Sequence, residues 1–568
     1  MNDPPASFDL IDQPWIRVLD QDARLSAASI RTVFHSAREI SQIAGELPTQ
    51  NFAILRVLLA ILQRSVLPRL ANSDPIDVWQ ELWKSSTLPL EDIDQYLERH
   101  RSRFDLLSAK TPFGQVADLR TAKEEAGPVR KLIAEVPDGH PFFTVRTGNG
   151  SDQLDFAEAA RWIIHVQAFD TAGIKSGVVG DPTVKGGKSY PIGTGWAGKL
   201  GGVYAEGPNL KETLLLNLVL DPALWSDDPY ADVPLWEQQP LTPDPTAHAS
   251  APAGPAQLYT WPSRAVRLIH DGDKVTGAVL TNSLRLDAPN KHQIEPMSMW
   301  RRSAAQEKAL RLPVVFMPKQ HQPDRALWRG LEALLPESSG ASPADHSVPA
   351  PGVLDWIGVL RESEALAPDT VVGIHAVGIS YGSNNSVVDE VIDDALSVHA
   401  ALLDPQNRQL RESANRAVAA ADGAVWELGR LATNIDVASG SSQPTVGATA
   451  RAAAYFALDQ PFRAWLAGLG LDSDLTESLA AWETIVRRIL RRAGEDLERQ
   501  APPNAFTGHP YKEKGKSRVG QGTQPERWMT VGRASAIFRR RLALALPNSR
   551  TPDETKPYPN EPAMETKS

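Results

Sequence analysis

The segment from about Pro48 to Leu67 carries apolar residues at helical spacing on most of its sides. They are Leu55, Leu58, Leu59, Leu62 and Val66. Thr49 is suited to cap the N-terminus of such a helix. Because a helix that is apolar nearly all round belongs in the interior, the pattern predicts a buried core helix.

Other parts of the chain before Tyr381 mix strand and helix patterns. Residues 8–20 alternate and are rich in β formers, and residues 156–169 have helical periodicity. Residues 266–286 have the pattern of two strands joined by an Asp-Gly turn. We therefore predict a large mixed α+β domain over residues 1–380.

From Ser386 on, the pattern becomes helical. The predicted helices cover residues 386–403, 406–435, 445–469, 474–500 and 525–546. In the fourth, a buried stripe is expected from Trp482, Ile485, Val486 and Ile489. The pattern predicts a C-terminal helical bundle of the four-helix type over residues 381–547. A polar tail, residues 548–568, is expected to be disordered.

Composition narrows the class of protein. The chain has 568 residues, of which 42% are hydrophobic and 23% charged, so a soluble protein with more than one core is expected. It has no cysteine, which excludes disulfides, cysteine nucleophiles and thiolate metal sites. No apolar run of transmembrane length and no signal pattern is found, so a cytoplasmic protein is expected. With a formal net charge of −10, binding of nucleic acid would need local basic patches.

Residues 172–202 form a glycine- and lysine-rich stretch. Ten of its positions are glycine and four are lysine, with Asp181 as the one acid. Glycine lets the backbone approach another molecule closely, and lysines with bare N–H groups attract phosphate. A long surface turn would have a similar composition. We expect an external molecule, a nucleic-acid backbone, to order this stretch.

A P-loop is a third interpretation of the same stretch. Gly187-Lys188-Ser189 matches the end of that motif. Its first glycine would fall on Pro182, which has no N–H to offer a phosphate. Tyr190-Pro191 follows where a helix should begin. The P-loop is therefore rejected.

Residues 378–382 match G-x-S-x-G, the nucleophile elbow of α/β-hydrolases, with Ser380 as the nucleophile. An elbow needs its helix to begin almost at the serine, whereas the residues up to Asn385 intervene here. His399 follows closely in the sequence, inside the next predicted helix. A serine hydrolase therefore stays the alternative function.

Positive charge is concentrated near the C-terminus. Residues 475–550 hold 15 Lys/Arg and 7 Asp/Glu, a charge of +8, so the rest of the chain carries −18. The clusters are Arg487, Arg488, Arg491 and Arg492; Lys512, Lys514, Lys516 and Arg518; and Arg539, Arg540 and Arg541. A solvated helix face is the simpler interpretation. Segregated charge on an acidic protein also favours contact with a polyanion.

Several segments together resemble one known family. They read FDLIDQPWIRVL, AGELPTQNFAILRVLLAIL, LLSAKTPFGQ, NLKETLLLNLVLD and EPMSMWRR, in that order along the chain. Their order and spacing are similar to those of the CasA family, the large subunit of the type I-E CRISPR surveillance complex Cascade. The resemblance spans most of the chain.

The resemblance implies sites for nucleic acid. A loop that contacts the protospacer-adjacent motif from the minor groove would be Gly173, Ile174, Lys175, Ser176 and Gly177, with Arg285 and Lys291 against the motif duplex. A wedge that parts the first base pair would be Asn384 and Asn385. A loop against the guide RNA and a neighbouring subunit would be Phe143, Thr144, Val145 and Arg146. Contacts of the bundle with DNA would come from Arg487, Arg488, Arg491 and Arg492.

The resemblance also implies a non-catalytic protein. Its expected role is to recognise the motif in double-stranded DNA, start strand separation for R-loop formation and help recruit the helicase–nuclease. The implied partners are the other Cascade subunits, crRNA, target DNA and that helicase–nuclease, without a membrane. No cofactor and no metal are expected.

Overall fold

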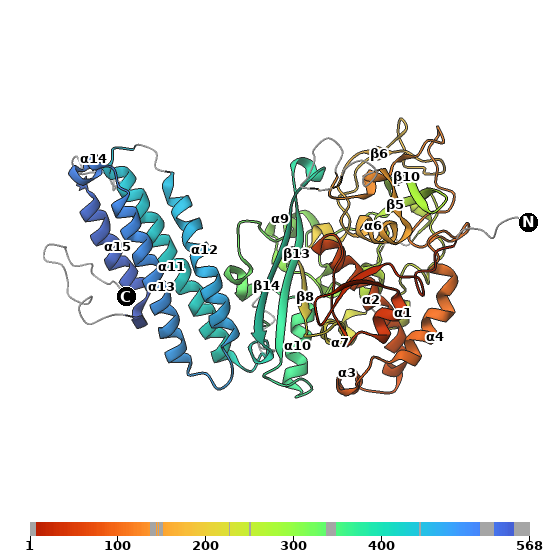
Figure 1. The fold of residues 1–568 in the computed structure, drawn as a ribbon, viewed down its shortest axis with the longest axis horizontal. Helices are drawn as coiled ribbons and strands as arrows, with labels where there is room; N and C mark the ends of the chain where they lie inside the picture. Colours follow the sequence, from red (N-terminus) through yellow and green to blue (C-terminus); the bar gives the residue numbers. More distant parts are fainter. Residues whose placement is uncertain are drawn as a thin grey trace, which may run out of the picture. The chain divides into compact units, whose positions relative to one another are not determined.

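The computed structural model describes residues 7–136, 144, 146, 152–225, 228–248, 251–336, 348–441, 445–511 and 527–549 (Figure 1). The chain divides into two compact units. Unit 1 comprises Met1–Leu327 and Ala333–Gln406, and unit 2 comprises Trp328–Glu332 and Asn407–Ser568. Unit 1 mixes helices and strands and unit 2 is helical, which confirms the predicted fold class.

Helix α2 (Pro48–Val66) is a buried core helix of unit 1, as predicted, although its N-cap is Leu47 rather than Thr49. Pro48 lies in its first turn, where a proline costs no hydrogen bond, and almost every later side chain is buried. The helix and the turn after it are long and apolar enough to cross a membrane, but 83% of the apolar window is buried in the protein. Burial against α6 (Phe156–Phe169) and α8 (Pro255–Tyr259) explains its composition.

Two sheets of unit 1 position the segments of interest. The predicted hairpin is β9 (Arg264–Asp271) and β10 (Lys274–Asn282), and β10 also pairs with β4 (Gly127–Pro128) and β5 (Leu154–Asp155). The second sheet has the order β14-β13-β8, from β8 (Gly202–Glu206), β13 (Val371–Tyr381) and β14 (Val388–His399). β13 and β14 form a long antiparallel hairpin (Figure 1).

This hairpin corrects two predictions. Residues 386–403 were expected to be helical, but most of them form β14, because their β-branched residues pair with β13 along its whole length. A domain boundary at residues 380/381 would cut the hairpin at its tip. The division between the units lies instead at Gln406/Asn407.

Unit 1 contains further helices and strands. They are β1 (Ile16–Asp20), β2 (Leu25–Ala28), α1 (Ile30–His35), β3 (Ile40–Ile43), α3 (Pro75–Lys84), α4 (Leu90–His100), β6 (Lys175–Ser176), β7 (Lys188–Ser189), α7 (Leu210–Leu216), β11 (Trp300–Arg302), α9 (Ala304–Leu310), β12 (Phe316–Pro318) and α10 (Gly352–Glu362).

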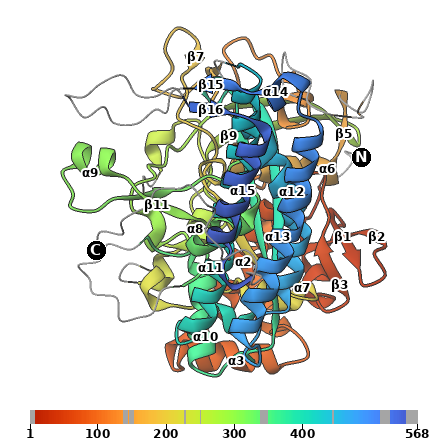
Figure 2. The same ribbon diagram turned by 90° about the vertical axis from the view of Figure 1, so that its left-hand side faces the viewer.

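Unit 2 is built from α11 (Arg408–Ala438), α12 (Val446–Ala467), α13 (Leu475–Arg499) and α15 (Val531–Ala545), which lie side by side (Figure 2). Four of the predicted helices are confirmed here. Short elements complete the unit: α14 (Pro503–Thr507), β15 (His509–Tyr511) and β16 (Arg527–Met529). Residues 550–568 of the predicted tail lie outside the described residues.

The buried stripe of α13 differs from the predicted one. Trp482 and Val486 are buried as expected, but Glu483, Arg487 and Leu490 join them. The Glu483 carboxylate accepts hydrogen bonds from the backbone N–H and the side-chain amide of Asn548, both at 2.7 Å. A polar pair of this kind lets a charged residue occupy an interior position.

Candidate nucleic-acid interface

The predicted reading loop, Gly173–Gly177, lies directly beside the tip of the β13–β14 hairpin. The backbone N–H of Ala172 donates to the carbonyl oxygen of Asn385, 2.8 Å away. Within the loop, the Ile174 side chain is 59% exposed, although it is large and apolar. The structure thus brings together two segments that lie far apart in the sequence.

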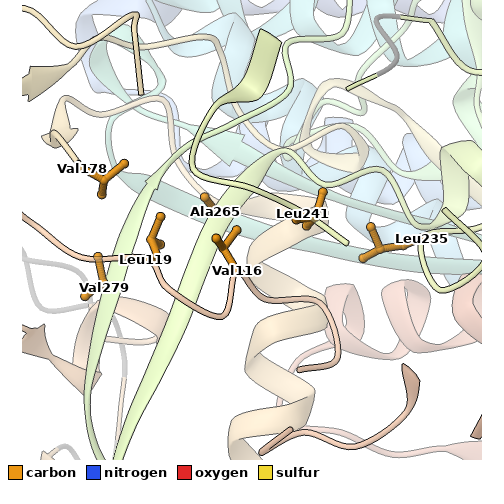
Figure 3. Close-up of a cluster of buried hydrophobic side chains, with 7 residues drawn as sticks. All are labelled: Val116, Leu119, Val178, Leu235, Leu241, Ala265 and Val279. Carbon is orange, nitrogen blue, oxygen red and sulfur yellow. The ribbon is translucent and has the colours of Figure 1, made fainter. Parts of the chain in front are cut away.

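The loop is held by the protein itself. Lys175 and Ser176 form β6, which pairs with β7, and the Gly177 N–H donates to the Gly187 carbonyl oxygen at 2.9 Å. Val178 then enters a buried apolar cluster, where it lies near Leu119 and Val279 (Figure 3). We had expected an external molecule to order this stretch, but internal pairing and burial already do so.

Lys175, which was predicted to contact the motif, has surroundings that the sequence did not indicate. Its ammonium lies 2.6 Å from the Asp170 carboxylate, and its side chain is only 10% exposed. Arg264 pairs with the same carboxylate. Although burial alone would raise it, Lys175 and Arg264 hold the pKa of the Asp170 carboxyl below its ordinary value. Burial lowers the pKa of Lys175, and Asp170 opposes that shift. Lys175 is therefore engaged in a buried ion pair rather than exposed to solvent.

Arg264 binds the backbone next to both ends of a partly exposed ribbon, residues 172–192. Its guanidinium donates to the carbonyl oxygen of Thr171 at 2.9 Å and to that of Gly193 at 2.8 Å. Neither Arg264 nor Asp170 was identified from the sequence. They lie far apart along the chain, and no local pattern indicates that they meet.

The second half of the glycine stretch is interior. A Cβ on Gly195 would lie 2.5 Å from the Ala168 backbone, one on Gly198 would lie 2.3 Å from the Tyr381 hydroxyl, and one on Gly202 would lie 2.6 Å from the Val377 carbonyl oxygen. These glycines allow close packing of the loop on α6 and β13. The predicted contact with nucleic acid is therefore restricted to the exposed positions of the ribbon.

Asn384 and Asn385 form the tip of the hairpin, and both side chains are exposed. Their φ angles are +56° and +54°, in the left-handed region that asparagine tolerates better than most residues. This geometry turns the chain sharply between β13 and β14. The structure thus places the two predicted wedge residues at a protruding turn.

The same hairpin overturns the hydrolase alternative. Ser380 lies within β13 opposite Glu390 of β14, so the chain is strand, turn, strand and has no elbow helix. His399 pairs with Val371 at the other end of β13. The extended strand from Val371 to Ser380 spans roughly 30 Å. Ser380 and His399 therefore do not form a catalytic pair.

The two predicted basic residues of the motif contact have different surroundings. Arg285 is exposed and lies 3.0 Å from the Asp287 carboxylate, a surface pair that solvent screens. Lys291 begins a short 3-10 turn after Asn290, whose backbone N–H donates to Phe316 of β12 at 2.9 Å. Lys291 is therefore fixed on a hydrogen-bonded turn and is partly exposed.

Of the predicted guide-RNA loop, Phe143 and Val145 lie outside the described residues. Arg146 pairs with Glu135 at 2.8 Å and with Glu158 at 2.5 Å. Thr144 accepts a hydrogen bond from the backbone N–H of Arg146 at 3.1 Å. Two carboxylates neutralise Arg146 in this structure, so it would need to exchange partners to meet a phosphate.

The four arginines of α13 that were predicted to contact DNA differ in exposure. Arg487 is buried and donates to the Leu546 carbonyl oxygen at 3.0 Å, a structural role. Arg488, Arg491 and Arg492 are exposed and line a groove of about 1010 Å³. Lys512, Lys514, Lys516 and Arg518 lie outside the described residues. In the third basic cluster, on α15, Arg539 lies 3.7 Å from the Glu498 carboxylate.

Among the described residues, no group of three His, Asp or Glu side chains is placed to hold a metal ion. Unit 1 thus presents a loop hydrogen-bonded to an exposed turn, and unit 2 presents a groove lined by exposed arginines.

Comparison with known proteins gives the family. The model of the family "CRISPR-associated protein Cse1" matches residues 9–493. The crystal structure of Cse1 from Thermobifida fusca has a TM-score of 0.86 and 41% identity, covering 97% of this chain and 100% of that chain. CasA/Cse1 from Thermus thermophilus is 30% identical over 358 residues, which span 61% of this chain and 64% of that relative. A chain in a solved "CRISPR RNA-guided surveillance complex" shares the fold, with a TM-score of 0.62 and 20% identity, covering 87% of this chain and 100% of that chain. The chain belongs to the CRISPR-associated protein Cse1 family.

Proposed function

We propose that this chain is the large subunit of a CRISPR RNA-guided surveillance complex of the Cascade type. In that role it reads a short protospacer-adjacent motif in duplex DNA and begins strand separation. The observation that carries the proposal is the hydrogen bond from Ala172 to Asn385, because it joins the reading loop to the wedge. Family membership and the fold shared with a surveillance-complex chain support it.

The loop suits reading by shape. A Cβ on Gly173 would meet no atom within 4 Å, so the fold itself does not require glycine there. Close approach of a minor-groove edge to the backbone at this position would require glycine. The minor groove offers a degenerate code that distinguishes A·T from G·C more than it distinguishes individual bases. A backbone approach of this kind therefore accepts a small set of motifs rather than one sequence.

The hairpin tip is suited to the first step of DNA strand separation. Parting one stacked step of DNA costs only about 1–2 kcal/mol. A small polar turn inserted beside the motif can offset that cost when backbone contacts hold the duplex against it. The residues proposed to recognise the motif and those proposed to separate the strands are thus joined by the hydrogen bond from Ala172 to Asn385.

The exposed arginines of α13 suit a sequence-independent contact. We assign to Arg488, Arg491 and Arg492 the retention of a DNA strand through its phosphates. The guide RNA, the other subunits and the helicase–nuclease are the remaining proposed partners. Binding, not catalysis, is the proposed activity.

The test is selection of DNA by the assembled complex. Duplexes randomised over the base pairs that flank a guide-matched target are captured and sequenced. The proposal expects enrichment of a short motif, and loss of this preference when the same target is supplied as a pre-opened bubble. Equal capture of all flanking sequences would overturn it.

A further inference from the structure

A cavity of about 280 Å³ lies beneath the reading loop. It is bounded by the C-terminal end of α6, the reading loop, the 3-10 turn Val129–Leu132 and the start of β14. Its apolar lining includes Val166, Phe169, Ile174 and Leu280. Its volume is near the lower limit of small-molecule pockets, roughly 300 Å³.

The charge of the cavity favours an anion. Among the described residues that line it, Arg130, Lys131 and Lys175 are cationic, and Asp170 is the one carboxylate. Asp170 is also paired with Arg264. Burial lowers the pKa of His165, another lining residue, to about 4, so it is neutral at pH 7. Lys131 and Lys175 thus face the Asp170 carboxylate, which is also shared with Arg264.

The position of the cavity indicates where such an anion comes from. Ser386 and Val388, which directly follow the asparagine tip, are part of its lining. Ile174 and Ser176 of the reading loop line it as well. A strand parted at the tip would therefore have its first unpaired nucleotides beside the cavity.

We propose that this cavity binds one unpaired nucleotide of the opened DNA, with its phosphate toward Lys131 and Lys175 and its base against Phe169 and Ile174. The inference rests on the proposed function and adds a capture site to it. Proteins that hold an extruded base combine an apolar pocket with polar contacts in this way. Capture of one nucleotide would oppose re-pairing and so stabilise the first open step.

Lys131 is the appropriate residue to change. It is exposed at the rim of the cavity, and its removal leaves the Asp170 ion pairs intact. Lys185 is the matched control, because it is an exposed lysine of the ribbon that does not line the cavity. The DNA is a motif-bearing bubble in which single phosphates are replaced by neutral methylphosphonates, at each of the first four unpaired positions of either strand.

Affinity is measured with the full chain assembled in its complex, as wild type, Lys131→Ala and Lys185→Ala. We expect one position on one strand where the neutral phosphate weakens binding by wild type and Lys185→Ala about tenfold. At that position the neutral phosphate should weaken binding by Lys131→Ala clearly less than tenfold, since this variant already lacks one of the two lysine contacts. The position and the strand on which it lies identify the captured nucleotide.

Two outcomes would overturn the inference: no position that couples to Lys131, or equal coupling to Lys185. Motif preference in the capture experiment would persist in both cases if the proposed function holds. Loss of motif preference with coupling to Lys131 retained would instead count against the proposed function alone.

Discussion

The backbone N–H of Ala172 donates to the carbonyl oxygen of Asn385 at 2.8 Å, where the reading loop meets the hairpin tip. A second bond reinforces this junction, because the Tyr381 hydroxyl donates to the Phe169 carbonyl oxygen at 2.6 Å. One end of the loop and the tip of the hairpin are thus fastened to each other.

The two asparagines allow side chain and backbone to be tested separately. Replacing Asn384 and Asn385 by glycine removes the side chains but permits the positive φ angles. Replacing both by alanine removes the side chains and adds roughly 1–2 kcal/mol of backbone strain per residue. If the side chains pry, both double variants should slow R-loop formation about tenfold, measured by stopped-flow fluorescence. Binding to a pre-opened bubble should be unchanged. Opening by the glycine variant at the wild-type rate would exclude the side chains as the wedge.

Gly173 and Gly177 form a matched pair within the loop. A Cβ on Gly177 would lie 2.6 Å from Val184 and 2.9 Å from the Gly187 backbone, so Gly177→Ala should cost about 1–3 kcal/mol of stability. Gly173→Ala should leave the melting temperature unchanged, because no atom lies within 4 Å of the added carbon. It should weaken binding of motif duplex about tenfold by keeping the groove away. Unaltered affinity for Gly173→Ala would mean that DNA does not approach the loop there.

The parts of the fold that were predicted correctly have strong local patterns. Helix α2 is evident because apolar residues surround it, and α11 and α13 because their periodicity extends over many turns. The sequence of strand β14 does not indicate a strand, because it is rich in acidic residues and its apolar residues do not alternate cleanly. Its structure is set by pairing with β13, which local sequence does not encode.

The candidate site shows the same limit at the level of single residues. Composition identified the stretch 172–202 and the family resemblance singled out Lys175 within it, but neither showed that Asp170 and Arg264 hold its charge in the interior. Arg487 and Arg488 are neighbours in sequence, yet one is buried and the other exposed. The rotation of α13 about its axis determines which of the two arginines is buried. The predicted stripe, which included Ile485 and Ile489, is displaced slightly around the helix from the observed one.

The buried ion pairs of Asp170 should respond unequally to loss of either partner. Asp170→Asn leaves Lys175 and Arg264 in the interior without a carboxylate, which should cost about 3–5 kcal/mol. Lys175→Met keeps the Asp170–Arg264 pair and the aliphatic volume and leaves no unpaired buried charge, so a smaller loss is expected. Denaturant unfolding measures both. Equal losses would show that Arg264 does not compensate Asp170. Lys175→Met is also a better probe of DNA contact than charge reversal, which would bring two carboxylates together.

His165 should make the stability of unit 1 depend on pH. It is buried, its ring nitrogen lies 3.0 Å from the Thr49 hydroxyl, and burial lowers its pKa from 6.5 to about 4. Between those values the unfolded chain binds a proton that the folded chain does not. Stability should therefore fall as the pH drops from 6.5 toward 4, by about 3 kcal/mol from this group. His165→Gln should lose correspondingly less over this range in urea unfolding. Parallel curves for the two proteins would contradict buried, neutral His165.

The arginines of α13 should be distinguishable by the salt dependence of DNA binding. If Arg488, Arg491 and Arg492 each contact a phosphate, every change to glutamine should reduce the slope of log affinity against log salt by about 1. Arg408→Gln is the control, since this exposed arginine of α11 lies 2.7 Å from Glu412 and outside the groove. Arg487→Gln should reduce stability instead, because it removes the bond to the Leu546 carbonyl oxygen. Slopes that do not change for the groove variants, or that change equally for Arg408→Gln, would remove the groove from the DNA-binding surface.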